Sequence, residues 1–291
     1  MTPILDPNVL RLALPKGRMQ DEVFSLLAEA GLRVRAGTRG YRPTISLPSC
    51  EVKLLKPQNI VEMLHAGSRD AGFAGADWVA ELDAEVVEIL DTHLDPVRVV
   101  AAAPEALLED GRLPDRSLVV ASEYERLARA WIAGRGLKAR FLRSYGATEV
   151  VPPEDADLIV DNTATGATLD ANGLVIVDQV MASTTRLFAH PRSLETPDRR
   201  DAIERLALLL GSVLDARRRV MLEVNVAADR LEAVCRILPC MREPTIAPLH
   251  RGAGYALKAA VLRDELAAVI PRIKAAGGSD IVVTSPSNIV A

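Results

Sequence analysis

The part of the chain best suited to chemistry is the segment 157–169, with the sequence DLIVDNTATGATL. A buried strand is predicted to deliver Asp161 to its carboxyl end, and a loop of small and hydroxyl-bearing residues follows. The backbone N–H groups of Thr165–Thr168 can turn toward one anion, with two hydroxyls beside them, which suits a phosphate. Asp161 can accept hydrogen bonds from two neighbouring sugar hydroxyls. The pattern indicates a ribose 5-phosphate site, and a polar turn with Thr165 or Thr168 as a helix cap is the alternative.

A second candidate for anion binding is Leu14-Pro15-Lys16-Gly17-Arg18, where an apolar strand meets the start of a helix. The helix N-terminus and the side chains of Lys16 and Arg18 favour a pyrophosphate-like group. Two solvated basic residues at a strand-to-helix turn are the alternative.

Three further polar residues follow predicted strands: Lys56, Asp77 in the motif GADW, and Glu149 in the motif SYGATE. Asp77 as a helix N-cap and Glu149 as an ordinary surface acid are the alternatives. Because ligands of α/β sheets bind beyond the carboxyl ends of the strands, we expect these residues to share one site with Lys16 and Asp161.

The elements that must position these residues alternate between short apolar runs and segments of helical periodicity. This order predicts α/β units with largely parallel sheets. Helices are expected after residue 18, over 56–64, after Ser122 as N-cap, and over 200–216. Strands are expected over residues 9–14, 52–55, 71–74, 86–90, 97–103, 118–121, 139–142, 158–161, 175–180 and 184–189.

The pattern changes after residue 216. Strands are predicted over 220–226, 245–249, 255–262 and 281–284, and helices over 229–238 and 264–276. The order βαββαβ is that of a ferredoxin-like module, which we expect to form a separate C-terminal domain beginning near Arg217.

Composition restricts the class of protein. The 291 residues suffice for two or three domains. The net charge of −4 gives no general attraction to nucleic acid or anionic lipid. We expect no membrane partner and a cytoplasmic location, because no apolar run approaches about 18 residues and the N-terminus does not resemble a signal peptide. The three cysteines and four histidines lack the spacing of zinc or redox sites.

Several kinds of catalytic site are excluded by missing motifs. Neither GxGxxG nor GxxxxGK[ST] occurs, which argues against a Rossmann dinucleotide site and a Walker-type site. No Ser/His/Asp or Cys/His arrangement stands out. Anion-binding loops with a few carboxylates suit the transfer of a group that has a diphosphate leaving group, because positioning and charge stabilisation dominate that chemistry.

Several motifs occur in order along nearly the whole chain: LPKGR, GADW, SYGATEV, DLIVDNTATGATLDANGL, ASTTRLFA, LPCMREPTIAPL and VIPRIKAAGG. With them the sequence resembles the long form of ATP phosphoribosyltransferase, the first enzyme of histidine biosynthesis. The resemblance implies a two-lobed α/β catalytic part, similar to a type II periplasmic binding protein, and a ferredoxin-like regulatory domain that senses histidine. It implies lobe I over 1–96 and 189–216, lobe II over 97–188, and the regulatory domain over 217–291, with crossings near Pro96 and Ala189.

The resemblance also implies an activity. Phosphoribosyl would pass from phosphoribosyl pyrophosphate to N1 of ATP with release of pyrophosphate, under feedback inhibition by histidine, in a homo-oligomer between dimer and hexamer. Mg²⁺ is the expected cofactor, bridging diphosphate oxygens, and no protein ligand to it is assigned. The implied contacts are Asp161, Thr163, Thr165, Gly166, Ala167 and Thr168 for phosphoribosyl; Lys16 and Arg18 for pyrophosphate; Lys56, Asp77 and Glu149 for the nucleotide; and Asn225, Thr245 and Ala247 for histidine.

Two departures from the family pattern stand out. Lys56 occupies a position where an arginine is common in relatives, and the two are not equivalent in bidentate contacts. The stretch Asn162-Thr163-Ala164 is uncharged, where some relatives carry a second acid.

The main alternative is a non-catalytic solute- or effector-binding protein of the same two-lobed fold. Such proteins usually carry an export signal and need neither LPKGR nor the loop 165–168. A phosphoribosyltransferase of the Rossmann-like type commonly shows two adjacent acids before its loop, whereas Asn162 follows Asp161 here. A regulator built from the C-terminal domain alone would leave the first 216 residues unexplained.

Overall fold

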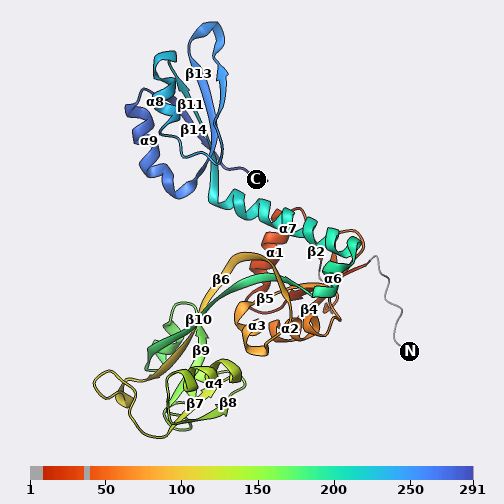
Figure 1. The fold of residues 1–291 in the computed structure, drawn as a ribbon, viewed down its shortest axis with the longest axis vertical. Helices are drawn as coiled ribbons and strands as arrows, with labels where there is room; N and C mark the ends of the chain where they lie inside the picture. The colour runs from red at the N-terminus through yellow and green to blue at the C-terminus, as the bar shows by residue number, and fades with distance from the viewer. Residues whose placement is uncertain (1–8, 36–39, 291) are drawn as a thin grey trace. The chain divides into compact units, whose positions relative to one another are not determined.

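The computed structural model describes residues 9–35 and 40–290. Residues 1–8, 36–39 and 291 lie outside the described residues. The chain divides into two compact units (Figure 1). The first contains the described residues up to Ala207, apart from Glu29–Gly31, and the second contains Glu29–Gly31 with Leu208 onward.

The first unit is built on one mixed sheet of eight strands, in the order β4-β1-β5-β10-β6-β9-β7-β8. The bounds are β1 Leu10–Pro15, β4 Cys50–Leu55, β5 Ala71–Gly75, β6 Val87–Pro104, β7 Leu118–Ser122, β8 Ala139–Arg143, β9 Leu158–Thr163 and β10 Leu174–Ala189. Strands β1, β4 and β5 pair in parallel, as do β7, β8 and β9. Strands β6 and β10 run antiparallel to each other and to their outer neighbours. The expectation of largely parallel pairing therefore holds for the outer strands and fails in the middle of the sheet.

In the described part of the chain, seven helices alternate with these strands, and α7 continues into the second unit. The bounds are α1 Gln20–Glu29, α2 Pro57–His65, α3 Ala76–Leu82, α4 Glu125–Gly134, α5 Ala167–Ala171, α6 Pro191–Glu195 and α7 Pro197–Arg218. The short strands β2 Val34–Arg35 and β3 Thr44–Ile45 form a separate pair. In α1 the spacing of Val23, Leu26 and Leu27 predicts a single buried face, and all three are fully buried. Each such side chain stabilises the fold by about 1.5–3 kcal/mol.

The two long strands β6 and β10 correct the sequence prediction. Each was expected as two separate strands, and each is continuous (Figure 1). Pro96 and the polar residues before it resemble the end of a strand. The structure absorbs them through left-handed backbone at His93 and Asp95, with φ of 56° and 45°, and through register shifts around Thr185.

The pairing of β10 changes along its length. Residues Thr185–Ala189 pair with β5, whereas Leu174–Ser183 pair with β6 alone. Ala189 is the last residue of β10 that pairs with β5. The partners of Ser183 and Thr185 on β6 are Val97 and Leu94. The crossings near Pro96 and Ala189 stay predictions.

Ser122 does not cap the following helix directly. Helix α4 begins at Glu125, and the N-cap position is Tyr124. The Ser122 hydroxyl instead donates to the Val160 carbonyl at 2.5 Å and accepts from the Tyr124 N–H at 2.8 Å. Ser122 therefore joins β7 to β9 and fixes the entry to α4.

The second unit confirms the predicted ferredoxin-like order. Its elements are β11 Arg219–Val226, α8 Leu231–Cys235, β12 Thr245–Pro248, β13 Tyr255–Leu262, α9 Leu266–Ala275 and β14 Ser279–Thr284. The sheet is antiparallel, in the order β12-β13-β11-β14. Alternate residues of β11 are buried with residues of α8 and α9: Val220, Leu222, Val224, Val226, Val234, Val269 and Ile273. Helix α8 is shorter than the predicted 229–238, because a 3-10 turn replaces its start and Pro239 disfavours helix just before it.

No helix within residues 9–35 and 40–290 is long and apolar enough to cross a membrane.

Candidate active site

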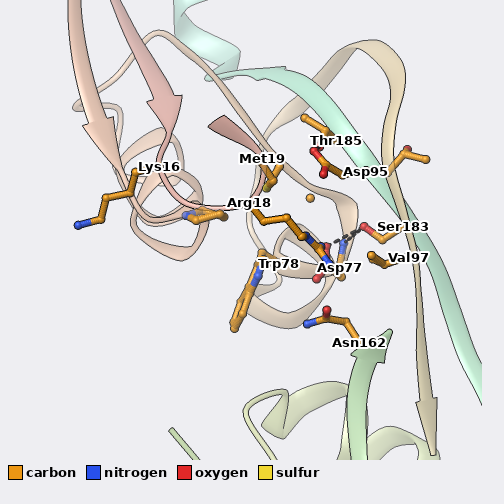
Figure 2. Close-up of a pocket in the computed structure, with 13 residues that line it drawn as sticks. Lys16, Arg18, Met19, Asp77, Trp78, Asp95, Val97, Asn162, Ser183 and Thr185 are labelled. Atoms are coloured by element: carbon orange, nitrogen blue, oxygen red, sulfur yellow. Dashed lines mark hydrogen bonds between the residues drawn. The ribbon is translucent and has the colours of Figure 1, made fainter. Parts of the chain in front are cut away.

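The carboxyl ends of β1 and β5 border a cavity of about 230 Å³ in the first unit (Figure 2). It brings together three residues singled out in the sequence, Lys16, Arg18 and Asp77. Its lining also includes polar or aromatic residues that sequence reasoning did not select: Trp78, Asp95, Asn162, Ser183, Thr184 and Thr185. Asn162 comes from β9, on the other side of the two long strands, so the cavity lies where the two lobes meet.

Asp77 is held by two hydroxyls from different parts of the chain. Only 5% of its surface is exposed. Ser183 donates to Oδ1 at 2.7 Å, and Tyr124 donates to Oδ2 at 2.6 Å. The N-cap of α3 is Gly75, so Asp77 lies one residue inside the helix and is not its N-cap. A carboxylate that accepts two buried hydroxyl bonds is fixed in place and can still accept from a ligand.

Residue 75 must be glycine because there is no space for a side chain beside Asp77. Its backbone conformation imposes no such requirement. Its φ of −73° suits any residue, but a Cβ there would lie 2.1 Å from Asp77 Oδ1. We expect Gly75→Ala to displace the Asp77 carboxylate. It should lower kcat/KM of the phosphoribosyl transfer that the resemblance implies by about tenfold or more, since one charge-assisted hydrogen bond contributes about 1.5–3 kcal/mol. Steady-state kinetics tests this, with Gly134→Ala as control because a Cβ at Gly134 meets no atom within 4 Å. Equal kinetics of the two variants would contradict the role expected of Asp77.

The two cations of the LPKGR motif differ in direction. The turn depends on Gly17, whose φ of 86° is open to glycine at little cost. Figure 2 shows the Arg18 side chain directed toward Asp77 and the Lys16 side chain directed away from it. The Lys16 ammonium lies 4.9 Å from the centre of the Tyr41 ring, within range of a cation–π contact. Arg18 is thus the cation oriented into the cavity.

In the loop 163–168, two of the backbone N–H groups expected to hold a phosphate donate to threonine hydroxyls. The Thr163 hydroxyl accepts from the Gly166 N–H at 3.0 Å, and the Thr165 hydroxyl accepts from the Ala167 N–H at 3.3 Å. Gly166, with φ of 91°, is the N-cap of α5. Thr165, Ala167 and Thr168 are exposed. The Thr165 hydroxyl thus bonds to the first N–H of α5, as the polar-turn alternative expects. Phosphate binding by this loop stays a prediction.

Asp161 is the most strongly perturbed acid of this region. Burial raises its pKa to about 6, and the negative charges of Glu149 and Glu123 add to the rise. Glu149 is half-buried in a 3-10 turn, Thr148–Val150, close enough to Asp161 to influence its ionisation. Perturbed acids of this kind cluster at functional sites.

The remaining predicted nucleotide residue, Lys56, lies apart. It is exposed at the N-cap position of α2 and makes no capping hydrogen bond with its side chain. Pro57 lines the cavity, but Lys56 does not. Asp161, Glu149 and the loop 163–168 likewise lie outside the lining of this cavity.

The three residues proposed for histidine binding share one face of the second unit. Asn225 pairs with Ala256, which pairs with Ala247, so these form one row across β11, β13 and β12. Thr245 lies two residues from Ala247 on the same face. The opposite face carries α8 and α9, so this row belongs to the face that the helices leave uncovered.

Among the residues that the structure describes, no three or more His, Cys, Asp or Glu side chains gather as ligands for a metal ion.

Comparison with known proteins gives consistent results over nearly the whole chain. The family model of ATP phosphoribosyltransferase matches residues 56–212, and the model of the HisG C-terminal domain matches residues 216–288. A relative named ATP phosphoribosyltransferase, from Pelotomaculum thermopropionicum, is 36% identical over 282 residues, covering 94% of this chain and 96% of the relative. Another of that name, from Chlorobaculum parvum, is 37% identical over 279 residues, covering 94% and 95%.

A solved structure supports the fold. The ATP phosphoribosyl transferase (HisG:HisZ) complex from Thermotoga maritima contains a chain that aligns with a TM-score of 0.58 and 24% identity, over 68% of this chain and 100% of that one. Two matching family models and near full-length relatives show that this chain belongs to the ATP phosphoribosyltransferase family.

Proposed function

We propose that this chain transfers phosphoribosyl from phosphoribosyl pyrophosphate to N1 of ATP, releasing pyrophosphate, in the first step of histidine biosynthesis. The observation that carries the proposal is the cavity between the lobes, where Arg18 and Asp77 of one lobe face Asn162 at the edge of the other lobe's sugar-phosphate loop. A binding protein of the same fold would not require a cation and a fixed carboxylate on one side and an acid-plus-hydroxyl loop on the other.

In this proposal, two groups of residues bind different parts of phosphoribosyl pyrophosphate. The loop Thr163, Thr165, Gly166, Ala167 and Thr168 holds the 5-phosphate, and Asp161 accepts from the ribose hydroxyls. Arg18 faces the diphosphate, with Lys16 farther out at the same turn. The bond from C1 to the diphosphate oxygen breaks as the bond from C1 to N1 forms, so the residues act by positioning and charge stabilisation.

The nucleotide side of the site is assigned to Asp77, Glu149 and Lys56. Asp77 fits this role because its carboxylate is fixed inside the cavity. Lys56 is exposed, so it acts only on a part of the nucleotide that extends beyond the cavity.

The donor atoms of the cavity suit Mg²⁺. Burial raises the pKa of Asp95, which accepts from the Thr185 hydroxyl at 3.1 Å, and a cation would stabilise its charged form. Mg²⁺ binds through one or two carboxylates with substrate phosphates and water, so Asp95 is the protein group best placed to join it. Bound there, the metal would neutralise charge that develops on the leaving diphosphate.

The activity is tested by combining the full chain with ATP, phosphoribosyl pyrophosphate and Mg²⁺. We expect near-ultraviolet absorbance to rise as N1-phosphoribosyl-ATP forms, and no rise when either substrate is omitted. Absence of product at high enzyme concentration would refute the enzyme and favour the binding protein.

We further propose that the second unit, from near Arg217, is a regulatory domain through which histidine inhibits, and that the chain forms homo-oligomers between dimer and hexamer. The uncovered sheet face supports the regulatory site and the assembly. A sheet face that carries both apolar and polar side chains and is not covered by helices suits a ligand or another subunit. Sedimentation giving only monomer at assay concentration would contradict the assembly.

Histidine inhibition is expected to depend on Asn225. Its amide donates to Asp280 Oδ2 at 3.0 Å, on the uncovered face. Asn225→Ala should raise the histidine concentration for half-inhibition by about tenfold, the effect of one lost hydrogen bond, and leave kcat unchanged. Lys274→Ala, on the helical side of the sheet, is the control. Unaltered inhibition in Asn225→Ala would remove this residue from the pocket.

A further inference from the structure

A chain of hydrogen bonds crosses between the two lobes beside the cavity. Asn162 Nδ2 of β9 donates to the Tyr124 hydroxyl at 2.9 Å, and that hydroxyl donates to Asp77 Oδ2 at 2.6 Å. Ser183, on the long strand β10, completes the chain by donating to Asp77 Oδ1 at 2.7 Å. One tyrosine hydroxyl thus connects the strand of the sugar-phosphate loop with the carboxylate on the opposite lobe.

Packing and hydrogen bonds around Tyr124 hold its hydroxyl in this position. Its side chain is fully buried, and its ring stacks on Trp78 of the other lobe with 4.7 Å between ring centres. The Ser122 hydroxyl fixes its backbone N–H. Burial and the Asp77 carboxylate raise the pKa of the phenol, so the hydroxyl remains a donor at all working pH values.

A second contact joins the same two lobes. Glu81 of α3 is 93% buried, with 7% of its surface exposed. Its carboxylate accepts from the backbone N–H of Arg126 at 3.1 Å and of Leu127 at 3.0 Å. These are first-turn N–H groups of α4, which lack partners within their own helix, and a carboxylate at a helix N-terminus is stabilising. Arg126 also pairs with Asp83 at 2.8 Å.

We propose that Tyr124 is a positioning residue, and that Tyr124, Asn162, Asp77 and Glu81 form an interlobe latch that fixes Asp77 in the cleft. The inference rests on the proposed function in assigning Asp77 to the substrate site. Opening the cleft requires the Tyr124–Asp77 bond and both Glu81 bonds to break together. Because Asn162 adjoins Asp161, a sugar phosphate that orders β9 also orders Tyr124 and hence Asp77, so the two substrates bind with positive coupling.

A double-mutant cycle tests whether the hydroxyl acts through Asp77. Tyr124→Phe keeps the ring stack and removes only the hydroxyl. We expect it to lower kcat/KM roughly tenfold or more, the factor for a lost hydrogen bond to a charged group, and to change it less than twofold in the Asp77→Asn background. Tyr255→Phe, in the second unit, is the matched control. An equal loss in both backgrounds, or no loss in wild type, would overturn the proposal.

Hydrogen exchange tests the latch without catalysis. In Tyr124→Phe, and separately in Glu81→Gln, we expect faster exchange at the start of α4, around Arg126 and Leu127, than in wild type. Unchanged protection in both variants would overturn the latch. If wild type forms no product, the proposed function fails while this measurement still decides the latch, and if Tyr124→Phe does not fold, Glu81→Gln decides it alone.

Discussion

Replacing Asp161 by alanine should weaken the binding of phosphoribosyl pyrophosphate by about 10²- to 10⁴-fold. Two ribose hydroxyls donate to this carboxylate in the proposed complex, and each charge-assisted hydrogen bond contributes about 1.5–3 kcal/mol. Isothermal titration calorimetry measures the change, with Asp170→Ala on the exposed side of α5 as control. Unchanged affinity would remove Asp161 from the sugar site.

The perturbed pKa of Asp161 adds a pH dependence to this prediction. The hydroxyls bind the ionised carboxylate, and its pKa is about 6, so affinity should rise between pH 5 and 7. The substrate's own phosphate titrates near pH 6, and the difference between wild type and Asp161→Ala isolates the protein group. Parallel profiles for the two proteins would contradict the assignment.

The same acid should lower the stability of the free protein at neutral pH. Its pKa is raised from 3.8 to about 6 on folding, so the folded state holds a proton that the unfolded state has lost between these values. Stability contributed by Asp161 is therefore present below about pH 4 and is lost as pH rises through 6. Asp161→Asn should unfold at a higher temperature than wild type at pH 7.5 and show no gain at pH 4.

Asp70→Asn should lower the free energy of unfolding by about 3–5 kcal/mol, because it leaves a buried arginine without its counter-charge. Asp70 is fully buried, and Arg11 donates to it from Nε at 2.9 Å, from Nη2 at 2.7 Å and from its backbone N–H at 2.8 Å. Ser193 donates to Oδ1 at 2.8 Å. This network ties the starts of β1 and β5 to α6, at the strand ends opposite the cavity.

Urea denaturation measures the loss, with the exposed pair of Lys138 and Asp115 as reference. Asp115→Asn should cost far less than Asp70→Asn, because solvent screens an exposed ion pair. Burial opposes ionisation of Asp70, but the hydrogen bonds from Arg11 and Ser193 outweigh it and lower its pKa below 3.8. The stabilisation is thus present above about pH 4 and is lost as pH falls through the folded pKa. A loss for Asp70→Asn no larger than for Asp115→Asn would contradict this account.

How much the sequence predicts depends on whether the signal is local. The buried face of α1, the burial of β1 and the βαββαβ order of the second unit follow from periodicity, and the structure confirms them. The continuity of β6 and β10 does not, because Pro96 and the polar residues around it indicate a break locally. Only the pairing of these strands with each other over both lobes holds them extended.

Some residues of the site could be predicted from the sequence and others could not. Lys16, Asp77 and Asp161 stand at strand ends, where an α/β pattern places ligands, and could be selected from sequence. Tyr124 and Asp95 could not. Tyr124 has the local features of a core aromatic, and it reaches Asp77 through a contact between residues 47 positions apart. Asp95 enters the cavity through left-handed backbone in the middle of a strand, which no residue spacing indicates.

The most direct test of the account is a crystal structure of the full chain with phosphoribosyl pyrophosphate and Mg²⁺. We expect the 5-phosphate within hydrogen-bond distance of the backbone N–H groups of Thr165–Thr168, the ribose hydroxyls on Asp161, and the diphosphate toward Arg18. A 5-phosphate bound at Arg18, with the loop 165–168 free of ligand, would contradict it.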